Sequence, residues 1–133
     1  MVNGMYHLNE KQLAQLKLQL NSKLIKVRAT INTIFLESDH SSHHLAAKNL
    51  ARLSADELIE FTSQVENSSL KRNVEKLKKL DASLNNIEHS MYGLCSDCES
   101  EMCVEMLTEN PTKQRCMICE DKYQKQKNNR YRL

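Results

Sequence analysis

Four of the five cysteines stand in two pairs of identical spacing, and this feature limits most strongly what the chain can fold into. Each pair has two residues between its cysteines, and seventeen residues separate the pairs. Two turns of this kind can present four thiolates to one ion at about 2.3 Å, in a closed tetrahedral shell without room for a catalytic water. The spacing therefore predicts one structural Zn2+, bound by Cys95, Cys98, Cys116 and Cys119.

A single C-x-x-C pair is also a motif of thiol–disulfide exchange, so redox chemistry is the competing interpretation. Two pairs at zinc-ribbon distance, with no βαβ pattern around them, favour the metal. The fifth cysteine, Cys103, does not fit the tetrad. We interpret it as a small, partly buried apolar residue, because the neighbouring Glu101 and Glu105 do not provide the electropositive setting of a reactive thiol. A spare thiol that exchanges with a ligand is the alternative.

The preceding residues are typical of long helices, since glycine and proline are scarce and apolar residues recur at helical spacing. The first helix is expected to begin near Asn9, where Gln12 completes a capping box. Its apolar residues then follow steps of three and four, as in a coiled-coil seam. They are Leu13, Leu16, Leu20, Leu24, Val27, Ile31 and Ile34, widened in places by Leu18, Ile25, Phe35 and Leu36.

Residues 39–54 break this pattern and predict the tip of a helical hairpin. His40, His43 and His44 have the spacing of metal ligands on a helix, but an exposed turn explains this polar stretch better. Part of the segment after residue 45 regains some helical character.

The second helix is predicted as one continuous element, Ala55–Ser90, about 54 Å long at 1.5 Å per residue. Ser54 and Glu57 are expected to form a capping box at its start, and Gly93 is expected to stop it. The apolar spacing slips between Val65 and Leu70, so any supercoil should be irregular.

The predicted fold is therefore mainly α. Residues 9–91 form a long antiparallel coiled-coil hairpin, and residues 92–133 form a small four-cysteine zinc-finger module with a basic C-terminal helix. The basic residues of that helix have no acid among them. They are Lys122, Lys125, Lys127, Arg130 and Arg132, and such a run is usually a solvated face.

The net charge of +2 gives no general attraction to nucleic acids. No stretch approaches the roughly 20 apolar residues of a membrane helix, and residues 1–8 lack the regions of a signal peptide. We expect a monomer in the reducing cytoplasm, away from membranes. No nucleophile–base constellation is visible and the metal site is closed, so the chain is not expected to be an enzyme.

The segment Tyr92 to Cys98, followed by Leu107, Pro111 and the pair Cys116 and Cys119, resembles the zinc finger of the DksA/TraR family. That family has an aromatic residue and glycine before its first cysteine pair, then an apolar segment, a proline and the second pair. The hairpin upstream resembles the coiled coil of the family, so the likeness extends from about Asn9 to the C-terminus.

The resemblance implies a transcription regulator of the stringent response that binds bacterial RNA polymerase directly and recognises no DNA sequence of its own. The coiled coil of such proteins enters the secondary channel and modulates initiation, and the alarmone ppGpp binds at the polymerase interface. By the same resemblance, Arg72 and Lys79 match basic positions on the second helix, and Asp56 and Glu57 are the acids in the stretch that corresponds to the acidic tip motif.

Several positions depart from the family pattern. The tip motif is reduced, and Glu99 replaces the glycine that usually follows the first cysteine pair, where a backbone angle easy for glycine is required. Asn110 and Glu120 stand where the family has basic residues that help hold ppGpp. We therefore expect a divergent member with an altered or absent ppGpp response.

Two other functions stay open on the sequence. The chain could be a zinc-ribbon protein whose basic tail binds nucleic acid, although the finger itself is rich in acids. It could also be a redox-sensing adaptor in which zinc loss releases the finger. Whether the protein activates or represses is not determined by the sequence.

Overall fold

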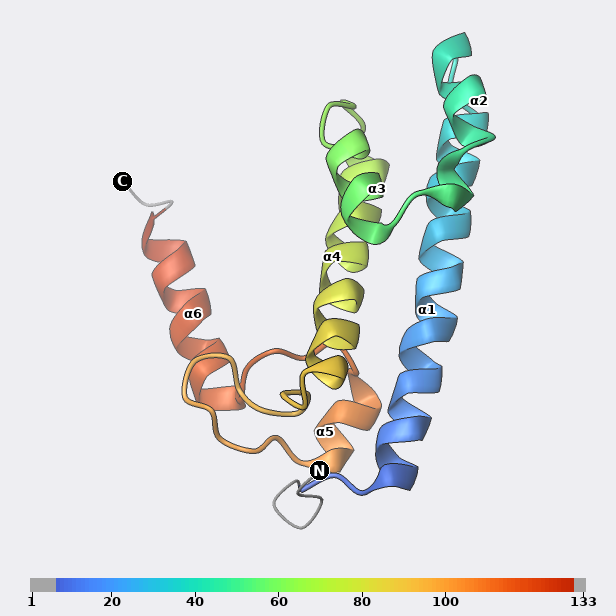
Figure 1. Cartoon of the computed structure of the whole chain (residues 1–133). Helices are drawn as coiled ribbons and strands as arrows, with labels where there is room; N and C mark the ends of the chain where they lie inside the picture. Colours follow the sequence, from blue (N-terminus) through green and yellow to red (C-terminus); the bar gives the residue numbers. More distant parts are fainter. Residues whose placement is uncertain (1–6, 131–133) are drawn as a thin grey trace. The chain divides into compact units, whose positions relative to one another are not determined.

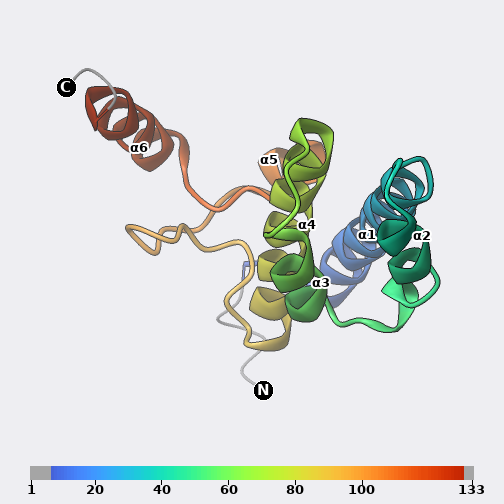
Figure 2. The same cartoon turned by 90° about the horizontal axis from the view of Figure 1, so that it is seen from above.

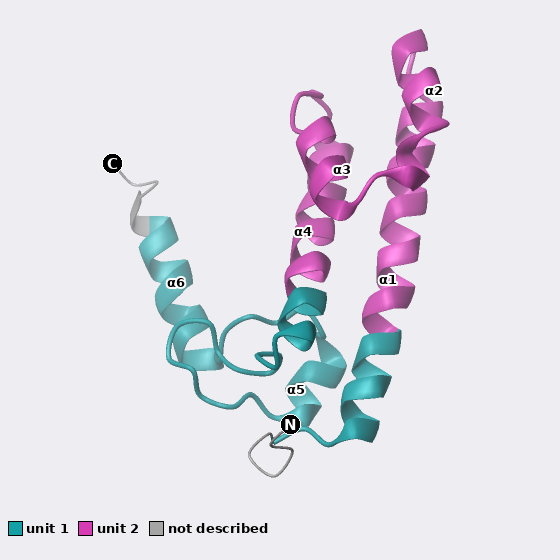
Figure 3. Ribbon diagram, in the orientation of Figure 1, with its two compact units in different colours: residues 1–18, 83–133 teal, residues 19–82 magenta. Residues whose placement is uncertain are grey.

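The computed structural model describes residues 7–130, and their side chains as far as residue 128. Within this range the chain is helical, with one isolated bridge between Leu94 and Glu101 in place of strands (Figure 1). Two compact units are formed (Figure 3): unit 1 joins residues up to 18 with those from 83 onward, and unit 2 is residues 19–82. The predicted boundary between residues 91 and 92 stays a prediction about independently folding domains. Arg132 lies outside the described residues.

The first helix, α1 (Glu10–Leu36), begins as predicted. The Asn9 side chain accepts a bond from the backbone N–H of Gln12, and the Gln12 side chain accepts one from the N–H of Asn9. This reciprocal box satisfies two donors that the first helical turn would otherwise leave unpaired. The local sequence alone is therefore sufficient to place this end of the helix.

Unit 2 is built around the apolar faces of α1 and α4 (Ser68–Glu88), which run side by side in both views (Figures 1 and 2). The predicted seam residues are buried or half-buried. Leu18, Ile25 and Leu36 are instead 70%, 69% and 52% exposed, so their assignment to the seam was wrong. They fall outside the arc that the 3.6-residue turn directs inward. The buried core residues of the two helices in unit 2 are Leu20, Val27, Ile31, Phe35, Leu70, Val74, Leu77 and Leu80.

The predicted tip contains more regular structure than a turn. A short helix, α2 (Ser41–Ala47), is followed by a 3-10 helix, η2 (Leu50–Arg52). The guanidinium of Arg28 on α1 donates bonds to the carbonyls of Leu50 and Leu53. These bonds, together with burial of Leu50, tie the returning chain to α1 within unit 2.

The second helix is interrupted, which corrects the prediction of one continuous Ala55–Ser90 helix. α3 (Ala55–Thr62) carries the expected Ser54 capping box, and α4 starts again at Ser68. Asn67 caps α4, because its side-chain oxygen accepts the N–H of Leu70. The Asn67 side chain replaces a backbone acceptor that a continuous helix would supply, so the helix can stop and start again here. The slip in apolar spacing before Leu70 lies at the same position.

The end of α4 also differs from the prediction, since Ser90 and not Gly93 reverses the chain. Ser90 adopts a left-handed backbone with φ of 57°. Its N–H bonds the carbonyl of Ile87, and the N–H of Met91 bonds that of Asn86, which is a Schellman motif. Gly93 has its own role, because at φ of 86° an added Cβ would lie 3.0 Å from the ring of His7.

Unit 1 has a small apolar core made from the first turns of α1, the loop after α4 and the short helix α5 (Val104–Glu109). Its most buried side chains include Tyr92, Met102 and Leu107. The Tyr92 hydroxyl donates to the carbonyl of Pro111 at 2.7 Å. Among the described residues, no helix combines the length and the apolar character needed to cross a membrane.

Candidate metal centre

The four paired cysteines come together in unit 1, as the spacing predicts. Their Sγ atoms all lie within 4.8 Å of one another, and those of Cys98 and Cys116 are 3.8 Å apart. Four sulfurs at 2.3 Å from a central ion would be separated by about 3.8 Å in a regular tetrahedron. The thiols are free rather than joined in disulfides, and the set therefore fits a metal ion held by four thiolates.

The first cysteine pair is presented by a tight hairpin. The N–H of Cys95 bonds the carbonyl of Ser100, and the N–H of Met102 bonds that of Gly93, while Glu99 closes the turn through the carbonyl of Cys95. Glu99 adopts a left-handed φ of 63° in this turn, a backbone angle that is easy for glycine and strained for other residues, as the resemblance led us to expect. Cys95 is buried and Cys98 is exposed.

The second pair lies at the start of α6 (Met117–Arg130). Cys116 precedes the helix, and its sulfur accepts the N–H of Cys119 at 3.5 Å. The N–H of Ser96 bonds the carbonyl of Gln114 at 2.7 Å and joins the two turns. The sulfurs thus come from a hairpin and a helix start, two rigid pieces of backbone held together by hydrogen bonds.

Backbone N–H groups around the sulfurs favour thiolates. Burial raises the pKa of the Cys95 thiol, but N–H donors of Cys98, Cys116 and Asp97 outweigh it and lower this pKa to about 6. The N–H of Cys119 lowers the pKa of Cys116. The pKa of Cys119 is raised to about 12, mainly by its hydrogen bond with the sulfur of Cys116. A bound cation would displace the protons that remain, so metal binding should release protons.

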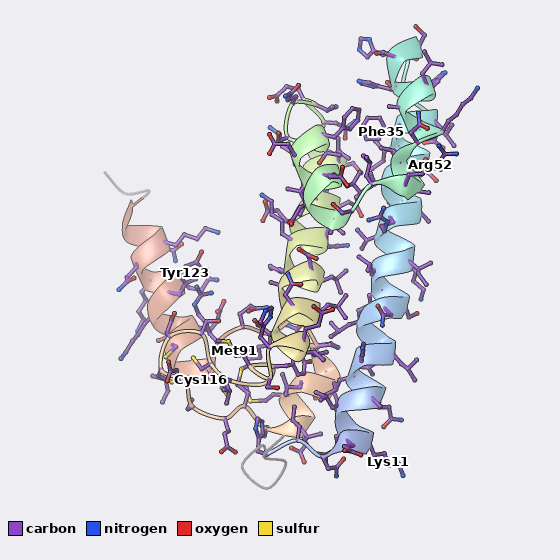
Figure 4. The ribbon with its side chains drawn as sticks, in the orientation of Figure 1. Lys11, Phe35, Arg52, Met91, Cys116 and Tyr123 are labelled. Atoms are coloured by element: carbon purple, nitrogen blue, oxygen red, sulfur yellow. The ribbon has the colours of Figure 1, made fainter. Side chains whose placement is uncertain are left out.

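Arg115 braces the outside of the sulfur cluster. Its Nε donates to the Asp97 carboxylate at 3.0 Å, and its guanidinium lies 3.9 Å from the centre of the Tyr123 ring on α6. A weaker ion pair at 3.9 Å links it to Glu120. Figure 4 marks Cys116 and Tyr123 in this region. The sequence analysis missed this role, although Arg115 stands directly before the second cysteine pair and Asp97 lies within the first.

Cys103 does not join the metal cluster, which agrees with the four-ligand prediction. The expectation of partial burial was wrong, because this thiol is exposed at the residue preceding α5. Its neighbour Met102 points into the core instead, since successive side chains of an extended segment alternate in direction. His40, His43 and His44 also form no metal cluster among the described residues.

The four predicted partner-binding residues all lie in unit 2. Arg72 and Lys79 are exposed on α4, seven residues apart, and so fall on nearly the same face. Asp56 and Glu57 are exposed in the first turn of α3. Glu57 is engaged locally: its carboxylate accepts the N–H of Ser54, and this bond, with that of the Ser54 side chain, lowers its pKa. Whether any of the four contacts a partner stays a prediction.

Comparison with known proteins supports the fold. One solved structure similar to this chain is that of the transcription factor DksA2 from Pseudomonas aeruginosa, with a TM-score of 0.59 and 17% sequence identity. The similarity covers 92% of this chain and 90% of that chain. No family model and no curated protein matches the sequence. The chain therefore has a DksA-like fold, a helical hairpin combined with a four-cysteine module.

Proposed function

We propose that this protein is a transcription regulator that binds bacterial RNA polymerase through its secondary channel and modulates initiation. The observation that carries the proposal is the combination, in one chain, of an antiparallel helical hairpin and a four-thiol module, over nearly the full length of a transcription-factor structure. Such a protein acts by occupying a channel and needs no chemistry of its own, so the proposal includes no enzymatic activity.

The resident metal is proposed to be a single structural Zn2+. Four thiolates whose sulfurs lie within 4.8 Å of one another can surround one ion tetrahedrally. This suits zinc, which has no geometric preference beyond what the ligands impose. Cys95, Cys98, Cys116 and Cys119 would hold it. The metal would fix the backbone of the module and would take no part in a reaction.

Arg72 and Lys79 are proposed to anchor the hairpin to an acidic surface of the polymerase. Both are exposed, and no ion pair engages either within the described residues. The alternative is that they are ordinary solvated charges, as is common on the flanks of coiled coils.

The decisive experiment is a binding titration with purified RNA polymerase core. The parent should bind, and the double variant Arg72→Ala and Lys79→Ala should bind more weakly at 0.1 M salt with unchanged helicity. The pair Lys71→Ala and Lys78→Ala removes the same charge from α4 at lysines that already have acidic neighbours, and it serves as the matched control. A parent protein that does not bind the polymerase would refute the function.

Asp56 is proposed to act on the polymerase after binding. Glu57 is committed to the capping box, whereas no hydrogen bond or ion pair within the described residues engages the side chain of Asp56. Asp56→Asn should alter promoter output in vitro while polymerase affinity and melting temperature stay near those of the parent. Output equal to the parent's at saturating protein would leave these acids only the task of stabilising the helix start.

We propose that the protein acts as a monomer in the cytoplasm and that its response to ppGpp is weak or absent. Glu120, at a position where the family resemblance expects a basic residue, accepts a bond from Gln124 and lies near Arg115. A carboxylate there repels a polyphosphate. Polymerase titrations with and without ppGpp should give the same affinity.

Nucleic-acid binding is the second candidate, because residues 121–128 of α6 are exposed throughout. Within the part of the chain that the structure describes, Lys122 and Lys127 make no ion pair, whereas Lys125 pairs with Asp121 at 3.1 Å. Phosphate binding through these lysines would weaken steeply with salt. A titration with duplex DNA between about 50 and 200 mM salt tests this candidate. It is supported only if affinity falls steeply with salt and if Lys122→Ala with Lys127→Ala makes that dependence shallower.

A further inference from the structure

Unit 2 contains a groove formed by two adjoining hollows where α1 ends. The larger has a volume of about 760 Å³ and lies between the last turn of α1 and the residues linking α3 to α4. The smaller, about 500 Å³, lies between α2 and the end of α3. His43, Gln64 and Val65 line both. The groove exists because the α2 segment and the break before α4 both add backbone here.

Four neighbouring side-chain rings form the floor of this groove. The ring of Phe35, on α1, lies 5.6 Å from that of Phe61 and 5.2 Å from that of His43, and His43 in turn lies 5.0 Å from His40. Figure 4 labels Phe35 in its place beside α3. Phe61 is 40% exposed and Leu45, in the smaller hollow, is 64% exposed. Apolar and aromatic surface is therefore open to an incoming side chain.

The rim of the groove is acidic. Glu37, Asp39 and Glu66 line the larger hollow, and no lysine or arginine lines either hollow among the described residues. Glu66 is already paired with Lys71 at 3.1 Å, so the uncompensated charge comes from Glu37 and Asp39. His43 bonds Ser38 through Nδ1 and so is oriented by the same turn.

We propose that this groove binds a segment of the polymerase that carries a lysine or arginine next to an apolar side chain. The inference rests on the proposed function and names the chemistry of one contact within it. A basic side chain has an apolar stem and a charged head, and these match the two parts of the groove. The stem and the apolar neighbour cover Phe61 and His43, because Phe35 beneath them is only 1% exposed, while the head faces Glu37 and Asp39.

The test combines charge reversal with covalent capture on purified RNA polymerase core. Glu37→Lys with Asp39→Lys reverses the rim, and Glu60→Lys with Glu88→Lys makes the same change of charge at exposed acids that do not line the groove. The rim variant should lose roughly tenfold in affinity at 0.1 M salt, as expected for unfavourable charge pairing at an interface. The control variant should lose much less. Circular dichroism establishes that both variants fold.

Capture identifies the occupant. A photoreactive p-benzoyl-phenylalanine replaces Gln64, an exposed residue common to both hollows, and the cross-linked polymerase peptide is identified by mass spectrometry. A peptide with a lysine or arginine beside an apolar residue supports the proposal. A peptide lacking basic residues, a cross-link to nucleic acid, or equal affinity of rim and control variants overturns it while polymerase binding by the parent stands. Failure of the parent to bind overturns the proposed function together with this contact.

Discussion

The cysteine module of unit 1 and the helical core of unit 2 hold their backbones by different means. In unit 2, a continuous apolar seam on α1 and α4 is removed from water, and Leu20, Ile31 and Leu77 are fully buried. The segment 92–119 also buries Tyr92, Met102 and Leu107, but its first knuckle is largely exposed from residue 96 to 101. Apolar burial is distributed over many contacts, whereas four thiolates concentrate the stabilisation of the module on one point. The two regions should therefore lose their folded structure through different substitutions.

Loss of the metal ligands should have the largest effect and should be confined to the module. Cys95→Ser with Cys116→Ser should abolish the stoichiometric zinc and unfold residues 92–119, since structural zinc contributes on the order of 10 kcal/mol in small modules. Metal analysis and amide exchange measure the effect, with Cys103→Ser as the control that keeps its zinc. Full zinc content in the double variant would exclude these ligands.

Removal of a core side chain from unit 2 should show the converse behaviour. Leu77→Ala opens a cavity at a fully buried position and should lower the free energy of unfolding by about 2–5 kcal/mol. The zinc content should stay at one per chain. Ile25→Ala removes a side chain that is 69% exposed and should change stability by less than about 0.5 kcal/mol. Denaturant titration compares the two, and equal losses would show that the exposed face of α1 is covered in solution.

Relief of the backbone strain at Glu99 should stabilise the module alone. A residue other than glycine loses about 1–2 kcal/mol of stability in the left-handed region. Substitution by glycine removes this strain, but the greater freedom of glycine in the unfolded chain cancels part of the stabilisation. Glu99→Gly should therefore add up to about 1 kcal/mol and slow zinc release to a chelator. Ser96→Gly, at an exposed knuckle position without a positive φ, should bring no such gain. Faster zinc release from the Glu99→Gly variant would show that its carboxylate, rather than its backbone, matters.

The smallest effect should be the acid sensitivity of α3 in unit 2. The pKa of Glu57 is lowered by its bonds to Ser54, so its contribution is complete above the ordinary glutamate pKa of about 4.3 and is lost as pH falls through the lowered value. Glu57→Gln keeps a capping box without a titrating group and should flatten the pH dependence of amide exchange in α3 between about pH 5 and 3. Glu60→Gln is the matched control on the same helix. An unchanged slope in Glu57→Gln would mean that the box does not form in solution.

The features predicted correctly are those encoded by neighbouring residues. The Asn9 and Ser54 capping boxes, the seam of α1 and the convergence of the four cysteines each depend on residues a few positions apart or on one repeated spacing. The second helix was predicted as continuous because its apolar pattern resumes at Leu70 with only a slip in phase. Asn67 lies within that slip, and its side-chain cap on the N–H of Leu70 starts a new helix there in spite of the longer apolar pattern.

By itself, the sequence determined the helical class, the starts of α1 and α3 and the number of thiols that cluster, because each follows from local geometry or ligand chemistry, whereas the unusual backbone at Glu99 was expected only from the family resemblance. Only the tertiary structure decided how Arg28 holds Leu50 and Leu53, how Arg115 joins Asp97 and Tyr123, and how Phe35, Phe61 and His43 form the floor of an acidic groove. These contacts join residues that are separated along the chain and share no repeating pattern. Their partners are selected by how the helices pack, and packing depends on the shape of the whole unit rather than on any single segment.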